Sequence, residues 1–172
     1  MSYHHGDLRR AMTAAAATAV AEQGPAGLSL RELARLAGVS HAAPAHHFGD
    51  KAGVLTAVAT EGFTLLAAAL GKAGDDLLAS GIAYVRFAVD HPGHFAVMFD
   101  RSLLHGDDVD LRAAEQAASE ALAGLTPDAD AARAAWSVAH GFASLWLSGA
   151  ITGPDVEAAA DPVLRRLVPT AG

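Results

Sequence analysis

The chain has 172 residues, of which 52% are hydrophobic and 18% are charged, so we expect it to fold around a sizeable core in one or two domains. It has no cysteine, which excludes disulfides, thiol catalysis and cysteine-ligated zinc. The formal net charge of −7 is unevenly distributed: residues 1–60 carry five Lys/Arg and four Asp/Glu, whereas residues 61–172 carry seven and fifteen. Only the N-terminal third could therefore face phosphate comfortably.

An arginine pair followed by an Ala/Thr/Val run near the N-terminus imitates a secretory signal. However, Asp7 precedes the arginines, and Thr13 and Thr18 interrupt the run. The apolar residues fit one helical face that Gly24-Pro25 would end, so we expect a helix from Asp7 or Leu8 to about Gln23. No uninterrupted apolar run reaches the ~18 residues that a membrane span requires, and we expect a cytoplasmic protein without a membrane partner.

Residues 29–51 predict a helix, a tight turn, a second short helix and the start of a third. Ser29 and Glu32 have the spacing of a capping box. Gly38 stands where a helix commonly ends in a left-handed residue, and Ser40 is expected to cap the next helix. This order is the helix-turn-helix signature, with a generic helical hairpin as the alternative.

A third helix is expected to follow the motif and to continue to about Lys72. Phe48 is interpreted as a core anchor, and Asp50 is expected to cap the long helix. Lys51 lies in its first turn, where free N–H groups and the helix dipole attract phosphate.

The segment LSLRELARLAGVS, with His47-Phe48, Asp50-Lys51 and Val54-Leu55, resembles the DNA-binding module of the TetR family of bacterial repressors. The resemblance implies a helix-turn-helix DNA-binding domain over residues 1–52. Residues 53–172 would form a helical ligand-binding and dimerisation domain, with the helix that ends near residue 72 as connector. A homodimer would then place two recognition helices in successive major grooves of a roughly palindromic operator.

The resemblance also indicates which side chains meet double-stranded DNA. We expect phosphate contacts from Ser29, Arg31, Ser40 and Lys51, and contacts to base edges or nearby phosphates from His41, Ala42, Ala45 and His46. Arg9, at the head of the first helix, either touches phosphate or is solvated. The main departure is Ala45, because the family usually has a phosphate-holding tyrosine there and alanine cannot replace it.

The remainder predicts an all-α fold, since no strand-period alternation occurs. Expected helices cover residues 77–90, a short stretch within 91–99, and residues 109–122. Two more cover 127–148 and 156–167, and a polar loop covers 100–110.

The pattern WxxxHG at Trp136, His140 and Gly141, and the stretch HPGHFAVMF, resemble one subgroup of TetR-like C-terminal domains. The resemblance implies a pocket for a small molecule and dimerisation through the last two long helices. The candidate ligand-binding residues are Tyr84, Phe87, His91, Phe95, Met98, Trp136 and His140, each with core packing as the alternative. The residues Ala135, Val138, Ala139, Phe142, Ala143 and Gly149 fit either a dimer seam or the domain's own core.

Metal and catalytic patterns are weak. Pro92 disrupts the helical face that His91 and His94 would need to share around one ion. Ser137 and His140 are within reach on one helix, but no glycine elbow accompanies them. We therefore expect no enzyme, no metal and no cofactor, but a regulator released from its operator by a small, mostly apolar molecule. The alternatives are a TetR-like ligand- or protein-binding module without operator binding, and a small helical enzyme using the His140 pocket.

Overall fold

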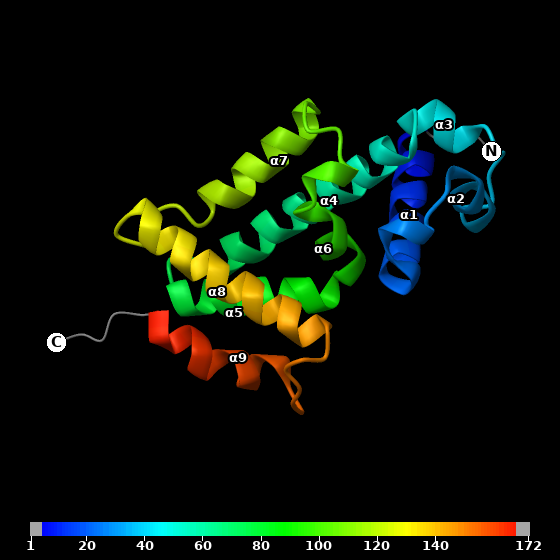
Figure 1. Ribbon diagram of the computed structural model, residues 1–172. Helices are drawn as coiled ribbons and strands as arrows, with labels where there is room; N and C mark the ends of the chain where they lie inside the picture. The colour runs from blue at the N-terminus through cyan, green and yellow to red at the C-terminus, as the bar shows by residue number, and fades with distance from the viewer. Residues whose placement is uncertain (1–4, 168–172) are drawn as a thin grey trace. The chain divides into compact units, whose positions relative to one another are not determined.

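The computed structural model describes residues 5–167, and every regular element in that range is a helix (Figure 1). This confirms the expected all-α class. The chain forms two compact units: unit 1 holds the residues up to 63 together with 92–114, and unit 2 holds 64–91 together with those from 115 onward. The expected functional boundary between residues 52 and 53 is a different kind of division and stays a prediction.

The first helix, α1 (His5–Gly27), contains a break at Gly24, where φ is 73° and ψ is 166°. Glycine adopts this conformation without strain, and Pro25 follows it. The uninterrupted part therefore ends at Gln23, as the sequence predicts. Its buried face includes Met12, Ala16 and Val20.

Helix α2 (Leu30–Leu36) begins and ends with local caps. Ser29 Oγ accepts a hydrogen bond from Glu32 N at 3.2 Å. The Glu32 carboxylate pairs with Arg35 instead of returning to Ser29, so only one arm of the predicted capping box forms. Gly38 has a φ of 65°, and Val39 N donates to Ala34 O at 3.0 Å, the bond that closes a Schellman motif.

The short helix α3 (Ala43–Phe48) starts later than the sequence suggests. Its N-cap is Ala42, which makes no side-chain capping bond, so the prediction that Ser40 caps this helix is wrong. Ser40 is joined to the helix through its carbonyl, which accepts from Ala43 N at 3.0 Å. The reason is Pro44, whose missing N–H suits the first turn and draws the helix start toward itself.

Helix α4 (Lys51–Ala73) has residues in both units. Asp50 caps it as expected, since its carboxylate accepts from Gly53 N at 2.8 Å. By length and composition alone this helix could cross a membrane, although it has no strictly apolar run of that length. However, 56% of its most apolar window is buried inside the protein, which is the pattern of a core helix.

Helix α6 (Pro92–Met98) packs against α1 within unit 1. The contact is close at Gly93, where an added Cβ would lie 1.9 Å from the carbonyl oxygen of Ala17. The 3-10 helix η1 (Arg101–Leu103) follows, and α7 (Val109–Glu120) has residues in both units.

Unit 2 is built on mutual contacts among α5 (Leu77–Asp90), α8 (Ala129–Leu147) and α9 (Val156–Leu164), with the 3-10 helix η2 (Arg165–Leu167) at the end (Figure 1). Each of the three α-helices has an aspartate N-cap, in the order Asp76, Asp128 and Asp155. Such caps stabilise a helix by roughly 1 kcal/mol.

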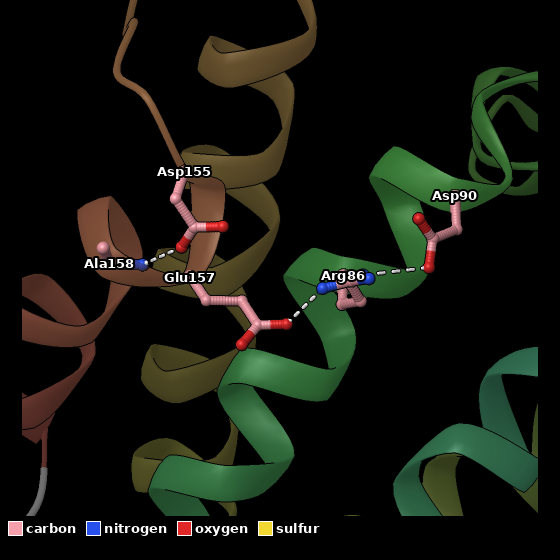
Figure 2. A network of polar contacts seen from close by, with 5 residues as sticks. All are labelled: Arg86, Asp90, Asp155, Glu157 and Ala158. Carbon is pink, nitrogen blue, oxygen red and sulfur yellow. Dashed lines mark hydrogen bonds and ion pairs between the residues drawn. The ribbon is translucent and has the colours of Figure 1, made fainter.

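An ion-pair network joins α5 to the start of α9 (Figure 2). The Arg86 guanidinium lies 3.1 Å from Asp90 Oδ2 and 2.5 Å from Glu157 Oε1. Asp155 Oδ1 accepts from Ala158 N in the same turn of α9. The side chains of Arg86, Asp90 and Glu157 are about half exposed, so these ion pairs contribute little to stability.

Candidate functional site

Unit 1 carries the side chains predicted to meet DNA between the N-cap of α2 and the first residue of α4. We call these residues the contact surface: Ser29, Arg31, Ser40, His41, Ala42, Ala45, His46 and Lys51. All are exposed except Lys51, which is half-buried. Contacts of α2 with both α1 and α3 hold these elements together (Figure 1).

The opposite faces of the two helices are buried. Leu33 and Ala34 of α2 have no exposed area, and Pro44 and Phe48 of α3 are buried as well. Phe48 is therefore a core anchor, as interpreted from the sequence. The Arg9 guanidinium lies 5.0 Å from the centre of the Phe48 ring, a cation–π geometry that ties α1 to α3.

The two arginines of α2 differ in how much charge they present to solvent. Arg35 donates to both carboxylate oxygens of Glu32, at 2.6 and 2.9 Å. This pairing raises the pKa of Arg35 and lowers that of Glu32. Arg31 is exposed and has no ion pair among the described residues, so its charge is better available to a phosphate.

Lys51 lies in the first turn of α4, as expected. Its Nζ donates to the carbonyl oxygen of Ala26 at 3.1 Å. An ammonium group has three N–H donors, so this bond leaves capacity for a phosphate oxygen while fixing where the group points.

No sequence pattern pointed to His105, which joins the loop before α7 to the start of α4. Its Nε2 lies 2.9 Å from Asp50 Oδ1, and its backbone N donates to Thr56 Oγ1 at 2.9 Å. The bonds from Gly53 and His105 lower the pKa of Asp50, which keeps the N-cap ionised. A contact over 55 residues of separation leaves no local pattern, so sequence reasoning could not have found it.

Unit 2 contains a small cavity between α5, α8 and the C-terminal end of α9. Its volume is about 30 Å³, which is room for a water-sized group. The cavity is lined by Leu77, Ser80, Gly81, Tyr84, Leu122, Thr126, Ala132, Ala135, Trp136, Ala139, Leu164 and Leu167. This lining is mostly apolar and contains no acidic or basic side chain.

Three predicted residues form a chain of hydrogen bonds beside this cavity. Trp136 Nε1 donates to Tyr84 Oη at 3.1 Å, and Tyr84 Oη lies 2.9 Å from His140 Nδ1. Burial raises the pKa of Tyr84, so its hydroxyl keeps its proton, and burial lowers the pKa of His140. In a neutral His140 that accepts the tyrosine O–H at Nδ1, the ring proton is on Nε2.

The seven candidate ligand residues are thus divided by the structure. Tyr84 and Trp136 line the cavity, and His140 bonds to Tyr84 without lining it. Phe87 of α5 and His91, the C-cap of that helix, have their rings 5.2 Å apart and are not part of this lining. The last two, Phe95 and Met98, are buried in unit 1. Their roles in ligand binding stay predictions.

Ser80 is a cavity residue that sequence reasoning missed. Its side chain has no exposed area, and its Oγ has no hydrogen-bond partner. Ser80 and Tyr84 are four residues apart and share a helical face, so a polar pair on an apolar helix was the available signal.

The possible dimer seam on α8 is also resolved in part. Ala139, Phe142 and Ala143 are buried within the chain, so they belong to the core. The outward side instead carries Leu145 and Leu147, with Val163 exposed on α9. A Cβ added at Gly141 would meet no atom within 4 Å outside the backbone of its own helix.

The weak catalytic patterns are not strengthened by the geometry. Ser137 Oγ donates to the carbonyl oxygen of Arg133 at 2.7 Å, and His140 Nδ1 faces Tyr84. His94 Nε2 lies 3.3 Å from Glu61 Oε2. No group of three or more potential ligands that could hold a metal occurs among residues 5–167.

Comparison with known proteins agrees with this architecture. Residues 13–58 match the family described as bacterial regulatory proteins of the tetR family, and residues 77–168 match the tetracyclin repressor-like C-terminal domain. No curated protein matches the sequence.

Three solved structures resemble the chain along nearly its whole length. A protein of unknown function from Rhodococcus sp. RHA1 is 33% identical, with a TM-score of 0.80 over 97% of this chain and 96% of that one. The multidrug binding protein EbrR, complexed with imidazole, is 26% identical, with a TM-score of 0.62 over 96% and 92%. The TetR-like transcriptional regulator LfrR from Mycobacterium smegmatis, in complex with proflavine, is 20% identical and shares the fold, with a TM-score of 0.72 over 96% and 99%. The two family matches together cover most of the sequence, and the chain belongs to the TetR family of transcriptional regulators.

Proposed function

We propose that the protein is a cytoplasmic, ligand-responsive repressor that binds a palindromic operator as a homodimer. The observation that carries the proposal is the two-sided construction of α2 and α3. Leu33 and Ala34 of α2 and Pro44 and Phe48 of α3 are buried, whereas the contact surface is exposed apart from the half-buried Lys51. A short helix held in this way can enter the major groove with its outer side chains against base edges.

Phosphate contacts would provide most of the affinity, and base contacts would provide the sequence preference. Arg31 and Lys51 supply the positive charges, while Ser29 and Ser40 supply hydroxyl donors. His41, Ala42, Ala45 and His46 face the base edges or nearby phosphates. Residues 61–172 are acidic overall and repel DNA, which favours an approach through the contact surface.

Dimerisation through α8 and α9 is supported by the apolar side chains on the outside of these helices. Leu145 and Leu147 of α8 and Val163 of α9 are exposed in the single chain. The open space at Gly141 would let a second helix approach closely. A second copy covering these residues would remove apolar area from water.

An effector in unit 2 is supported by the cavity and by the two relatives solved with small molecules, proflavine in LfrR and imidazole in EbrR. We expect a mostly apolar effector next to Tyr84 and Trp136. It would release the operator only if it binds more tightly to a state of the dimer in which the two DNA-binding domains are wrongly spaced than to the DNA-binding state. Helices α4 and α7 run through both units and are the continuous elements that could transmit the change.

The second candidate function is a ligand- or protein-binding module without an operator. Ala45 favours it, because alanine stands where the family usually has a tyrosine that holds phosphate. Recovery and sequencing of fragments bound from random duplex DNA separates the two functions. A repressor enriches a palindrome with two half-sites, and recovery of unrelated fragments would support the module instead.

A further inference from the structure

The cavity of unit 2 has one polar atom with unused hydrogen-bonding capacity. Ser80 Oγ is fully buried and has no partner, although a buried hydroxyl ordinarily finds one. Ser80 lies one helical turn before Tyr84 on α5, and both residues line the cavity. An unsatisfied buried polar atom beside an open space indicates that something else completes the site.

The other polar atoms in the lining are already engaged. Tyr84 Oη accepts from Trp136 and bonds to His140, and Thr126 Oγ1 donates to the carbonyl oxygen of Asp128 at 3.2 Å. Ser80 is therefore the group that can give a new hydrogen bond without breaking an existing one. Its hydroxyl can donate one bond and accept others.

The lining also restricts the charge of an occupant. No Asp, Glu, Lys or Arg side chain contributes to it. A carboxylate or an ammonium group placed there would lose hydration and gain no opposite charge. Charged molecules are thus disfavoured, whereas an uncharged oxygen group is not.

Burial differs along the cavity and orients the occupant. Ser80 has no exposed area and Trp136 is 42% exposed, so within the lining the serine marks the closed, buried end and the indole the more exposed one. The small volume of the cavity accepts a hydroxyl or carbonyl group at the closed end. The apolar remainder would lie along Trp136 and Leu167.

We propose that Ser80 is the polar recognition group of the effector site, and that the effector is an uncharged apolar molecule with a hydroxyl or carbonyl oxygen that hydrogen-bonds to Ser80. This inference rests on the proposed function only in that the bound molecule is called an effector. The binding site itself is defined by the cavity, its uncharged lining and the Ser80 hydroxyl, which has no hydrogen-bond partner.

The test uses probes that share a hexyl chain and differ in the head group: 1-hexanol, 2-hexanone, hexanoate and hexylammonium. Binding to the full chain is followed by the indole N–H signal of Trp136 in proton–nitrogen correlation spectra. The chain has two tryptophans, and Trp146→Phe assigns the two signals. No DNA is present, so the outcome is independent of operator binding.

We expect 1-hexanol and 2-hexanone to shift the Trp136 signal in a saturable way, and the charged probes to bind more than about tenfold more weakly. Ser80→Ala should weaken binding of the neutral probes by roughly two- to tenfold, the range for one neutral hydrogen bond. Ser137→Ala is the matched control, because it removes an exposed hydroxyl from α8 that does not line the cavity, and it should leave binding unchanged.

Equal binding by Ser80→Ala would mean that only a resident water meets the serine, and would overturn the proposal. Equal binding of hexanoate or hexylammonium, or no saturable shift with either neutral probe, would overturn it as well. The proposed regulatory function fails by a different result, namely the absence of an enriched motif in the selection from random DNA. Each idea can therefore fail while the other stands.

Discussion

Tyr84 and His140 join α5 to α8 within unit 2, with Tyr84 Oη 2.9 Å from His140 Nδ1. Burial lowers the pKa of His140 below its ordinary value of 6.5, which favours the neutral ring in this contact. Protonation would make Nδ1 a donor, so Tyr84 Oη would have to accept from His140 as well as from Trp136. The contact thus ties the packing of two helices to the charge of one histidine.

This relationship predicts a pH dependence of stability. Because the folded-state pKa of His140 is depressed, the unfolded chain binds more protons between that pKa and about 6.5, and the free energy of unfolding decreases as the pH falls through this window. Urea denaturation of the wild type and of His140→Gln should show a shallower pH slope for the variant. His41→Gln, at an exposed site, is the control and should keep the wild-type slope. Identical slopes for all three proteins would contradict this assignment.

We predict a large loss of stability when Gly93 is replaced by alanine. The Cβ of Gly93→Ala would meet the Ala17 carbonyl oxygen at 1.9 Å, so α6 must move away from α1. We expect destabilisation by about 1–3 kcal/mol or more, measured by urea denaturation. The matched control is Gly71→Ala in α4, where no atom lies within 4 Å of the new Cβ, and helix propensity predicts a small gain. Equal stability of the two variants would show that α6 is not held against α1 in this way.

Lys51 predicts a salt-dependent contribution to DNA binding. Lys51→Ala should weaken binding to all sequences and reduce the slope of log affinity against log salt by about 1. Lys72→Ala removes the same charge near the other end of α4, from an exposed site in unit 2, and should leave that slope unchanged. Fluorescence anisotropy over a salt series measures both. If Lys51→Ala keeps the wild-type salt slope, the Lys51 side chain bonds to Ala26 and does not contact phosphate.

Ala45 predicts a gain of affinity. The side chain is exposed on α3, so Ala45→Tyr should fit without disturbing the buried face and should restore a phosphate contact. Gel-shift titration should show tighter binding with little change in sequence preference. Ala68→Tyr, at an exposed position of α4 in unit 2, controls for added aromatic area. Weaker operator binding by Ala45→Tyr would refute the prediction.

Local chemistry made much of the fold predictable. Gly38, Asp50 and Pro92 act on their nearest neighbours, and each helix start or end expected from such a residue is found close to its predicted place. Ser40 is the exception, because two helix-starting signals lay close together and Pro44 prevailed.

The candidate site was less predictable because it depends on distant residues. Tyr84 and Trp136 could be proposed from aromatic type and family pattern, but their hydrogen bond joins positions 52 residues apart. Phe95 looked equivalent to Phe87 in sequence, since both are aromatic residues on apolar helices, yet the two lie in different units. The burial of Ser80 follows from the approach of α8 and α9 to α5, which no local pattern encodes.

The central claim is that the exposed face of α3 reads base sequence. The most direct test is selection of bound fragments from random duplex DNA, carried out in parallel with the wild type and with His46→Ala. His46 is exposed, so the substitution should leave the fold intact. We predict a palindromic motif for both proteins, with preferences altered at symmetry-related positions of the two half-sites in the variant. No motif for the wild type, or the same motif for both proteins, would contradict the claim.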